Sequence, residues 1–599
     1  MQRHGGQILV DQLVRFGVRR VFSVPGESFL AALDGLHDAQ IDNIVCRQEG
    51  GVAMMAEAYG KMTGQPGIAF VTRGPGATNA SAGIHIAMQD STPMILFVGQ
   101  IRAEDRDREA FQEVDYKSMF GSIAKWVTEV NHTERLPEYI ARAFNVATAG
   151  RPGPVVLALP EDMLSAMVDV PDCHGPMVEL APTLATVAED AMHWLCQFER
   201  PLVVVGGPHW SHEAAGHLAT FAEVQNLPVT LGFRRQDYLD NRHPNYAGDL
   251  NVGINPKLAR RMRDADALLV IGSRLGDIET QGYSLIDPAK PHLAICHVHA
   301  DPNEHGHVYA PDIAVTSDAV SFTRALAQLP ASGADWSDWT QSARTDYLEW
   351  IKPQETPGDV KLEQIVAWLS ANLPEDAILT NGAGNYAGWL HRYFTFKQYG
   401  TQLAPTSGSM GYGFPAAISA SLEHPSRTVV CLAGDGCFQM TCNELSTAAQ
   451  HGATPIVIVV NNGRYGTIRM HQEKHYPGRV SGTMLANPDF AALARAYGGH
   501  GETVTKTADF PTAFERAGSC GTFAVIELQV SPDALSTGTT LSGLAASSEH
   551  SKTCPECGHV FQGNGWDGID AHWKSKHDDV MPYKDAWPLL KSGMYKPVS

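Results

Sequence analysis

The sequence predicts an α/β protein built from three doubly wound parallel-sheet domains and a small additional tail. Apolar, strand-like runs alternate with helix-length segments in three separate stretches, which is the pattern of parallel sheets covered by helices. A chain of 599 residues is too long for one hydrophobic core, so several domains are expected. The end of the chain differs, because two cysteines and two histidines stand there at short spacings. We expect domains at 1–168, 190–330 and 358–532, and a tail at 550–599.

The strands of the first two domains can be read in order along the chain. An amphipathic helix in "MQRHGGQILVDQLVRFGV" should precede strands in "RRVFSVPGES", "NIVCRQEGG", "GIAFVTRGPGATN", "PMILFVG" and "GPVVLALP". The second domain should take its strands from "RPLVVVGG", "LPVTLG", "DALLVIGS" and "HLAICHVHAD". Residues 166–190 and the segment "ASGADWSDWTQSART" predict linkers. The Ser/Thr/Ala/Gly-rich stretch 532–552 predicts a flexible linker before the tail.

Composition excludes several classes of protein. The hydrophobic content of 44% is ordinary for a globular protein, and no apolar run reaches the roughly 18 residues that a membrane span needs. The N-terminus does not have the pattern of a signal peptide. A net charge of −20 argues against general nucleic-acid binding. Most of the ten cysteines stand singly, which predicts reduced thiols and a cytoplasmic location.

The segment 434–462 carries the strongest chemical signal. It begins with Gly-Asp-Gly and ends with Asn-Asn. Buried strands are predicted in "RTVVCLA" and "PIVIVV", and the capping-box spacing of Thr441 and Glu444 predicts that a helix starts there and ends at Gly452. This strand–helix–strand unit places Asp435 and Asn462 after the carboxyl ends of neighbouring parallel strands. A carboxylate and an amide oxygen at that edge suit Mg²⁺, while Gly434 and Gly436 allow close approach to a diphosphate.

This segment resembles the thiamine diphosphate motif, in which GDG is followed after about 24–28 residues by NN. The resemblance implies that Asp435, Asn462 and the backbone carbonyl of Arg464 hold Mg²⁺, with Cys437 among the cofactor contacts. Three α/β domains in this order are similar to the pyrimidine-binding, middle and diphosphate-binding domains of that family. The likeness is closest to the large catalytic subunit of acetolactate synthase, and it extends to "GPGATN" at 74–79, "AFQE" at 110–113 and "TAGRPGPVVLALPED" at 148–162.

The same resemblance implies the catalytic and cofactor-shaping residues. Glu49 matches the acid that exchanges a proton with N1′ of the pyrimidine, and burial would raise its pKa. Glu57, the nearby competitor, is expected to be an exposed helical residue. Gln112 matches a glutamine near the reacting carbon, although a surface amide in a loop is an equal alternative.

Two glycine-rich stretches resemble the walls of the cofactor site. In "PTSGSMGYGFPAA", Met410 would wedge between the two cofactor rings, and the Gly408 carbonyl would accept from the 4′-amino group. "TNGAGNYAGW" resembles a second diphosphate loop, with Gly384, Asn385 and Tyr386 at the contacts.

Two features depart from the acetolactate synthase pattern. His471 stands where these synthases usually carry a tryptophan. Arg469 lies near the position of a catalytic Glu in simple pyruvate decarboxylases, and it would suit an anionic substrate or else face solvent. These synthases also bind a non-redox FAD, and Gly206, Gly207 and Arg274 resemble parts of that site, so FAD stays open.

The predicted function is decarboxylation of a pyruvate-like 2-oxo acid with ligation of the product to a second carbonyl compound. A non-ligating decarboxylase of the benzoylformate or phenylpyruvate type and a sulfoacetaldehyde acetyltransferase-like enzyme are the alternatives. A non-catalytic regulatory relative is a further one. The resemblance also implies a homodimer or homotetramer, because each site of the family combines two subunits.

The tail has the spacing of a Cys₂His₂ zinc finger. Cys554 and Cys557 are followed by His572 and His577 in a C-x₂-C…H-x₄-H arrangement, which would form a closed, structural Zn²⁺ site. Phe561 and Ile569 occupy the places of the small core, and the fourteen-residue spacer requires an inserted "GNG" turn. Basic and acidic residues are balanced in the tail, so protein docking is expected rather than DNA reading.

Overall fold

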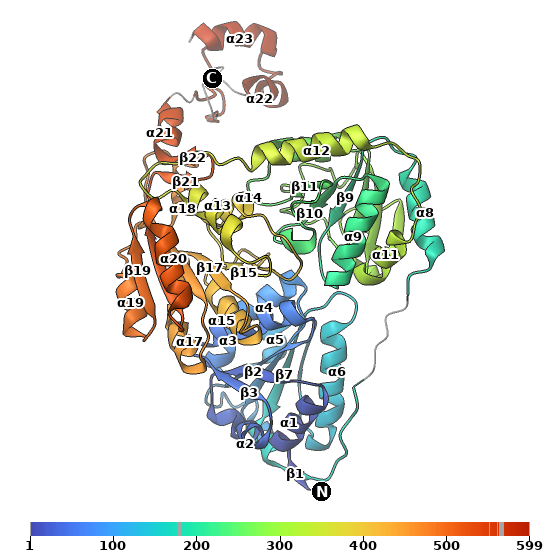
Figure 1. Cartoon of the computed structure of the whole chain (residues 1–599), viewed down its shortest axis with the longest axis vertical. Coiled ribbons are helices and arrows are strands. Elements are labelled where there is room, and N and C mark those ends of the chain that lie inside the picture. Colours follow the sequence, from blue (N-terminus) through green and yellow to red (C-terminus); the bar gives the residue numbers. More distant parts are fainter. Residues whose placement is uncertain are drawn as a thin grey trace.

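The structure, a computed structural model, describes residues 2–175, 182–549, 552–559, 561, 568–592 and 594–597. Within these residues it contains three six-stranded sheets in which every pair of neighbouring strands is parallel. The three sheets confirm the predicted fold class. Figure 1 shows the first domain at the bottom, the middle domain on the right, the third on the left and the tail at the top.

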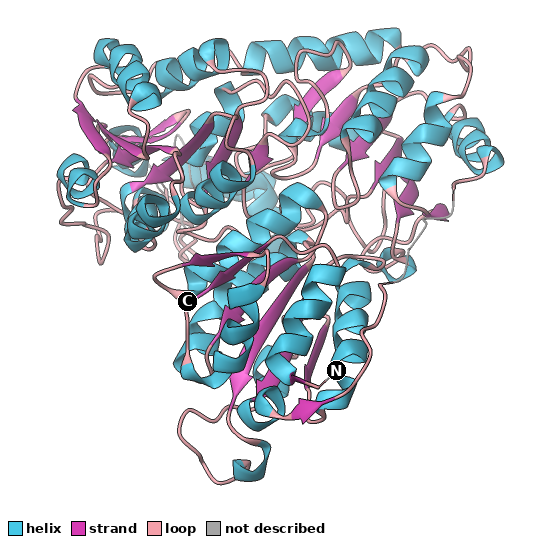
Figure 2. Ribbon diagram, turned by 60° about the horizontal axis from the view of Figure 1, so that its bottom comes forward, coloured by secondary structure: helices cyan, strands magenta, loops and turns pink. Residues whose placement is uncertain are grey.

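The first sheet has the strand order β3-β2-β4-β5-β7-β6. Helices cover both of its faces (Figure 2), which is why β4, β5 and β7 are buried along their whole length instead of alternating. The strands are β2 (Arg20–Ser23), β3 (Asp42–Val45), β4 (Gly67–Val71), β5 (Met94–Gln100), β6 (Trp126–Glu129) and β7 (Pro154–Pro160). The helices are α1 (Gly5–Arg15), α2 (Leu30–Asp38), α3 (Glu49–Thr63), α4 (Pro75–Asp90), α5 (Tyr116–Phe120), α6 (Leu136–Thr148) and α7 (Glu161–Ser165).

The middle sheet has the order β11-β10-β9-β12-β13-β14. Successive strands are added on one side of β9 up to β11 and then on its other side from β12, so the switch point of the strand order lies between β9 and β12. Its strands are β9 (Pro201–Val205), β10 (Val229–Leu231), β11 (Tyr246–Asp249), β12 (Ala267–Ile271), β13 (Ala294–His299) and β14 (Ile313–Thr316). Its helices are α8 (Ala185–Leu195), α9 (His212–Gln225), α10 (Pro256–Asp264), α11 (Ala319–Ala327) and α12 (Ser337–Trp350). The prediction of a linker before residue 350 is therefore wrong, since α12 occupies it. Trp336 and Trp339 anchor this segment through bonds from their indole N–H groups to the Phe198 and Pro201 carbonyls.

The third sheet has the order β16-β15-β17-β18-β20-β19, which repeats the strand order of the first. Its strands are β15 (Ile378–Asn381), β16 (Gln402–Leu403), β17 (Val429–Gly434), β18 (Ile456–Asn461), β19 (His500–Val504) and β20 (Ala524–Gln529). Its helices are α13 (Leu362–Asn372), α14 (Ala387–Tyr393), α15 (Gly413–Glu423), α16 (Asp435–Gln439), α17 (Leu445–His451), α18 (Gly466–His475), α19 (Phe490–Ala496) and α20 (Phe510–Ser519).

The connection between β17 and β18 differs from the predicted single helix. α16 starts at Asp435 itself, and a short 3₁₀ turn precedes α17, which ends at Gly452 as expected (φ +69°). The capping box is absent: Glu444 is fully buried and accepts hydrogen bonds from the backbone N–H groups of Arg47 and Gln48, both at 3.1 Å. A residue assigned to a helix start thus joins the third domain to the first.

The described part of the stretch predicted to be a flexible linker, residues 532–549, is also ordered. It forms a hairpin, β21 (Ala534–Ser536) with β22 (Thr539–Thr540), followed by α21 (Leu541–Glu549). The Asp533 carboxylate accepts from the N–H and the hydroxyl of Ser542 at 2.7 and 2.9 Å, which stabilises the start of α21. The tail adds α22 (Ile569–Lys576) and α23 (Tyr583–Ser592). Among the described helices, none combines the length and apolar character needed to cross a membrane.

Candidate active site

A cavity of about 220 Å³ lies at the carboxyl edge of the third sheet. Strands β17 and β18 are neighbours there, and Asp435 and Asn462 follow their last residues directly. Every third-domain residue that the sequence predicted to hold the cofactor or its metal lines this cavity: Gly384, Asn385, Tyr386, Gly408, Met410, Gly434, Asp435, Gly436, Cys437, Asn462 and Arg464. The structure therefore gathers residues from four separate stretches of sequence.

Asp435 is the buried anion of the cavity. It is 3% exposed, and its carboxylate accepts from the N–H groups of Gly436 at 2.8 Å and Gly463 at 2.9 Å. Burial raises the pKa of this carboxyl group, and the hydrogen bonds oppose that shift. The amide oxygen of Asn462, on the loop that follows β18, accepts from the Arg464 N–H at 3.1 Å. A carboxylate, an amide oxygen and a nearby backbone carbonyl are the hard oxygen donors that fit Mg²⁺.

Asn487 supports the metal loop and was missed by the sequence analysis. Its side-chain N–H₂ donates to Asp435 Oδ2 at 2.7 Å and to Asn461 Oδ1 at 2.8 Å. Asn487 lies 52 residues after Asp435 in the chain. No spacing rule connects the two positions, so only the fold reveals the contact.

Glycines and the ring of Tyr386 shape another side of the cavity. Gly384 and Gly408 have φ values of +146° and +66°, which L-residues with side chains rarely adopt. A Cβ atom on Gly434 would lie 2.9 Å from the Tyr386 ring. The Tyr386 hydroxyl donates to Cys437 Sγ at 3.2 Å, and the thiol sulfur also accepts from the Gly411 N–H at 3.1 Å. These contacts fit a diphosphate held by backbone groups.

The hairpin after the third sheet closes one side of the cavity. Val530, Ala534 and Leu535 line it. The Leu535 carbonyl accepts from the Asn385 side chain at 2.8 Å. This wall comes from the stretch whose composition indicated a flexible linker, so composition alone did not reveal its role.

Glu49 lies outside this cavity, at the start of α3 in the first domain. It is partly exposed, and Asn79 donates to its Oε2 at 2.9 Å, leaving Oε1 beside the turn at Gly76. Gln48 caps α3 by accepting from the N–H groups of Gly50 and Gly51. Glu49 is thus firmly placed at the edge of the first sheet, away from the residues that line the third-domain cavity.

Gln112 belongs to the same edge as Glu49. A Cβ atom on Gly74, which precedes α4, would lie 2.8 Å from the Cβ of Gln112. Gln112 lies in the loop 106–115, which precedes α5. Three non-glycine residues of this loop, Asp107, Glu109 and Gln112, have positive φ values of 63°, 53° and 66°. Such backbone strain is concentrated at functional sites.

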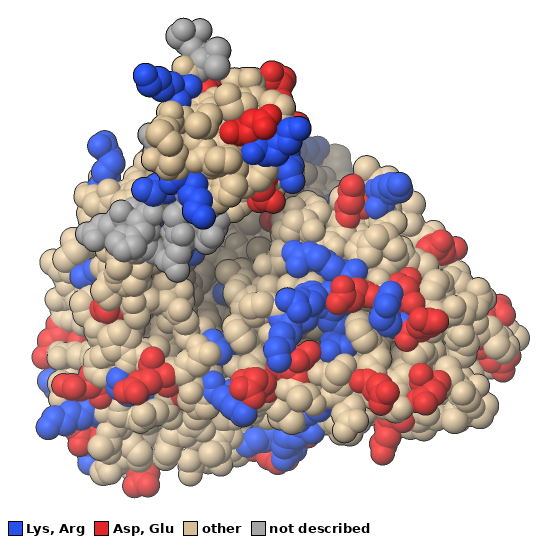
Figure 3. Space-filling model, turned by 90° about the horizontal axis from the view of Figure 1, so that it is seen from above, with Lys and Arg blue, Asp and Glu red and all other residues tan. Residues whose placement is uncertain are grey.

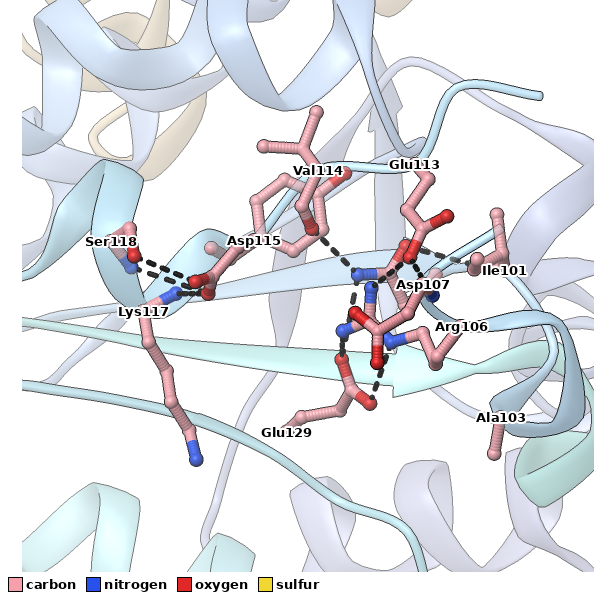
Figure 4. A network of polar contacts seen from close by, with 12 residues as sticks. Ile101, Ala103, Arg106, Asp107, Glu113, Val114, Asp115, Lys117, Ser118 and Glu129 are labelled. Carbon is pink, nitrogen blue, oxygen red and sulfur yellow. Dashed lines mark hydrogen bonds and ion pairs between the residues drawn. The ribbon is translucent and has the colours of Figure 1, made fainter. Parts of the chain in front are cut away.

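Exposed and partly buried hydrogen bonds hold this strained loop in place. The Glu113 carboxylate accepts from the N–H group of Asp107 at 2.8 Å (Figure 4) and from that of Ala110 at 2.9 Å. These backbone hydrogen bonds lower the pKa of Glu113. Arg106 pairs with Glu129 on β6. The loop is therefore anchored to the first sheet.

Arg469 is 8% exposed, so the alternative of a solvent-facing arginine is wrong. It pairs with Glu473 one turn further along α18, at 2.7 Å. Its Nη1 atom is buried and has no hydrogen-bond partner among the described residues. Arg469 does not line the third-domain cavity, although Thr467 and Ile468 beside it do. His471 is exposed on the same helix.

The residues that resemble parts of a flavin site lie in the loops after β9 and β12 of the middle domain. A Cβ atom on Gly207 would lie 1.8 Å from the Gly272 carbonyl oxygen, so the two loops pack directly on each other. The Trp210 indole donates to the Gly206 carbonyl at 2.9 Å, and the Tyr238 hydroxyl donates to the Gly207 carbonyl at 2.7 Å. Arg274 is paired with Glu304 at 2.8 Å. Gly206, Gly207 and Arg274 are thus engaged by groups of the same domain.

The tail brings its four predicted metal ligands together. The ligand atoms of Cys554, Cys557, His572 and His577 all lie within 4.8 Å of one another. Cys557 Sγ is 3.3 Å from Nε2 of each histidine, close to the edge of about 3.5 Å expected for a tetrahedral zinc site. The predicted "GNG" turn lies outside the described residues.

A small apolar core supports these ligands. Phe561 and Ile569 are buried, as predicted, together with Cys554, Trp573, Ala586 and Leu590. The Trp573 indole donates to the Met581 carbonyl at 2.7 Å. The helix α23 therefore packs on α22 and extends the module beyond a single finger.

Comparison with known proteins agrees with this geometry. Three family models match the chain: the N-terminal TPP binding domain of thiamine pyrophosphate enzymes at residues 3–119, the central domain at 188–326, and the C-terminal TPP binding domain at 382–528. The tail lies beyond all three.

Relatives resemble the chain over most of its length. The Escherichia coli acetolactate synthase isozyme 2 large subunit is 30% identical over 84% of this chain and 91% of its own. The Corynebacterium glutamicum acetolactate synthase large subunit is 31% identical over 86% and 84%. The mitochondrial acetolactate synthase catalytic subunit of Saccharomyces cerevisiae is 29% identical over 88% and 80%. The chain therefore belongs to the thiamine pyrophosphate enzymes, as a member of the acetolactate synthase large-subunit type.

Proposed function

We propose that the protein decarboxylates a pyruvate-like 2-oxo acid and joins the remaining fragment to a second carbonyl compound. The observation that carries this proposal is the third-domain cavity, where four separate stretches of sequence supply a metal loop and a glycine-rich diphosphate cradle. Thiamine diphosphate, when bound, supplies a carbon nucleophile and an acceptor for the electron pair left as CO₂ departs.

The residues of the cavity would hold and orient this cofactor. Asp435, Asn462 and the Arg464 carbonyl would bind Mg²⁺. Backbone groups beside Gly384 and Gly434 would approach the diphosphate. Met410, which lines the cavity and is partly buried, would support the bend between the cofactor rings.

Glu49 would exchange a proton at N1′ of the cofactor pyrimidine. Its Oε2 is engaged by Asn79, so Oε1 is the oxygen that would carry the proton. Since Glu49 does not line the cavity of its own chain, we propose that it completes the cavity of a second copy in a homodimer or a homotetramer. Each chain then contributes two half-sites.

Gln112 and Arg469 are the proposed substrate-side residues. Gln112, like Glu49, lies against the start of α4. It would therefore line the cavity of the partner subunit together with Glu49. The buried, unpaired Nη1 of Arg469 supports a role in holding an anionic substrate group. Both proposals depend on the assembled dimer.

Product analysis tests the proposed reaction. The protein would be incubated with pyruvate and a panel of 2-oxo acids, with thiamine diphosphate and Mg²⁺, while CO₂ and product masses are measured. We expect a ligated product such as acetolactate or acetoin. Aldehyde alone would indicate a simple decarboxylase, and acetyl phosphate from a sulfonated aldehyde would indicate an acetyltransferase. Formation of neither CO₂ from any 2-oxo acid nor acetyl phosphate from a sulfonated aldehyde and phosphate would leave a regulatory relative.

We also propose one structural Zn²⁺ in the tail, bound by Cys554, Cys557, His572 and His577. Two thiolates and two imidazoles form a closed set that leaves no position for a substrate. Acidic and basic side chains stand next to one another on the face that carries the tail (Figure 3). This mixed surface supports a docking role rather than nucleic-acid binding.

The direct packing of the middle-domain loops after β9 and β12 supports a protein that works without FAD. An extract of the denatured purified protein should then show no flavin absorption. None of the ten cysteines, all of them described in the structure, forms a disulfide bond, which supports the proposed cytoplasmic location.

A further inference from the structure

The segment 404–412 carries two residues of the cofactor cavity, Gly408 and Met410. The segment connects the edge strand β16, which ends at Leu403, to α15, which begins at Gly413, and it contains no helix or strand itself. Irregular backbone is held in one conformation only by contacts from its surroundings. Within the third domain, Gly411 bonds to Cys437 and Thr441. The other bonds that fix the segment come from groups at its two ends.

The start of the segment is bonded by the first domain and the middle domain. The Asp90 carboxylate, at the end of α4, accepts from the Thr406 N–H at 2.7 Å and from the Thr406 hydroxyl. Lys61 donates to the Ala404 carbonyl at 3.1 Å. The Arg234 guanidinium of the middle domain donates to the Pro405 carbonyl.

The end of the segment is bonded by Glu57. The Tyr412 hydroxyl donates to Glu57 Oε2, and the Thr92 hydroxyl donates to Glu57 Oε1 at 2.7 Å. The sequence analysis expected Glu57 to be exposed, and this is wrong: the residue is fully buried where α3 packs on α15 (Figure 1). The helical pattern of α3 alone could not show that Glu57 is buried, because α15, which packs on it, comes from a distant part of the chain.

Glu57, Lys61 and Asp90 form one buried ionic cluster. Lys61 lies 3.3 Å from Glu57 and pairs with Asp90. Burial raises the pKa of Glu57. Burial also acts to raise the pKa of Asp90, but Lys61 and Arg235 outweigh it and lower that pKa. Buried ion pairs are often no more stabilising than apolar replacements, so stability alone does not explain this cluster.

We propose that Glu57, Lys61 and Asp90 are positioning residues that clamp both ends of segment 404–412 and thereby fix Met410 and Gly408 for the cofactor. The proposal rests on the proposed thiamine diphosphate site. The clamp comes from the same helix, α3, that begins with Glu49.

The test changes one side chain of the clamp at a time in the full-length protein. Tyr412→Phe deletes the hydroxyl that reaches Glu57 and keeps the ring, and Glu57→Gln removes the charge. Tyr309→Phe is the matched control, because Tyr309 is also buried and donates to a backbone carbonyl, in the middle domain at 3.0 Å. Amide hydrogen exchange of a peptide spanning 404–412, thiamine diphosphate affinity, kcat and Tm would be measured.

We expect Tyr412→Phe to speed amide exchange in 404–412 by roughly tenfold, the effect of losing one hydrogen bond to a charged group. Thiamine diphosphate affinity and kcat should fall by about 10- to 100-fold, as expected when reacting groups are displaced by about 1 Å. Tyr309→Phe should lower Tm without changing these values.

Wild-type exchange in 404–412 together with wild-type cofactor affinity in Tyr412→Phe would overturn the clamp. A fall in Tm alone, equal to that of Tyr309→Phe, would do the same. If wild-type protein bound no thiamine diphosphate, the proposed function would be wrong, and the exchange measurement would still decide whether Glu57 orders the segment.

Discussion

Two carboxylic acids, Asp435 and Glu49, occupy environments that suit different tasks. Asp435 is 3% exposed and receives hydrogen bonds from two backbone N–H groups and from Asn487. Glu49 is partly exposed and receives one from Asn79. The first arrangement suits the proposed metal ligand, and the second leaves Oε1 of Glu49 without the Asn79 contact.

Glu49→Gln should leave the fold and cofactor binding nearly intact and should slow turnover by roughly 100-fold or more, because an amide cannot exchange the proton. Initial rates of CO₂ release with saturating cofactor would measure this. Wild-type rates would remove Glu49 from the mechanism.

Asn487→Ala should weaken Mg²⁺-dependent binding of thiamine diphosphate by about 10- to 100-fold, the usual cost of losing a group that orients a metal ligand. Titration calorimetry would give the dissociation constants. Asn372→Ala is a suitable control, because Asn372 is exposed and its side chain bonds only within its own helix end. Equal affinities for both variants would contradict the role given to Asn487.

Site residues were predictable where a motif fixes them and not where the fold alone does. The Gly-Asp-Gly triplet and the Asn-Asn pair lie at the carboxyl ends of two neighbouring buried strands. Parallel-sheet geometry therefore predicts that they lie close together. Glu57 and Glu444 have ordinary helical settings in the sequence, yet each bonds across a domain boundary. Local patterns contain no information about such partners.

Secondary-structure elements show the same division. The strands with long apolar runs between turn residues were predicted, such as β5 and β7 in the first domain, β9 and β12 in the second, and β17 and β18 in the third. The sequence analysis did not single out β6, β11, β14, β16, β19 or β20. The helix α12 and the hairpin before α21 were missed, because their composition is polar or small. Tertiary contacts order them: two tryptophans bond to the middle domain next to α12, and Leu535 bonds to Asn385 at the cavity.

The tail is the element whose stability should depend on a metal. Its apolar core is small, so Zn²⁺ binding should supply most of its folding free energy. Cys554→Ser should abolish about one Zn²⁺ per chain and make the tail sensitive to protease, while turnover stays within about twofold. Elemental analysis and limited proteolysis would measure this.

Cys196→Ser is the control for this prediction, because Cys196 is an exposed thiol in the middle domain. It should keep the zinc. Absence of zinc from wild-type protein purified without chelators would contradict the metal site.

The whole molecule places its two sets of functional residues apart. Glu49 and Gln112 both lie against the start of α4 in the first domain, while Asp435 and Asn462 line the third-domain cavity. Two chains arranged about a two-fold axis would join each set to its complement.

Mixing inactive Glu49→Gln protein with inactive Asp435→Ala protein should restore activity, because half of the mixed dimers' sites contain neither substitution. After complete subunit exchange, about a quarter of wild-type activity is expected for a two-fold symmetric dimer. Turnover would be followed as a function of exchange time. An active monomer in sedimentation would contradict the shared site.

Titration of thiamine diphosphate into the purified protein tests the central claim most directly, since the claim is that the third-domain cavity binds this cofactor through a metal. Wild-type protein should bind only with Mg²⁺ present, and Glu49→Gln should bind nearly as well. Asp435→Ala should lose at least roughly 100-fold in affinity, because a metal ligand is removed. Equal binding by wild-type and Asp435→Ala protein, or binding unaffected by removal of Mg²⁺, would contradict the assignment of the cavity.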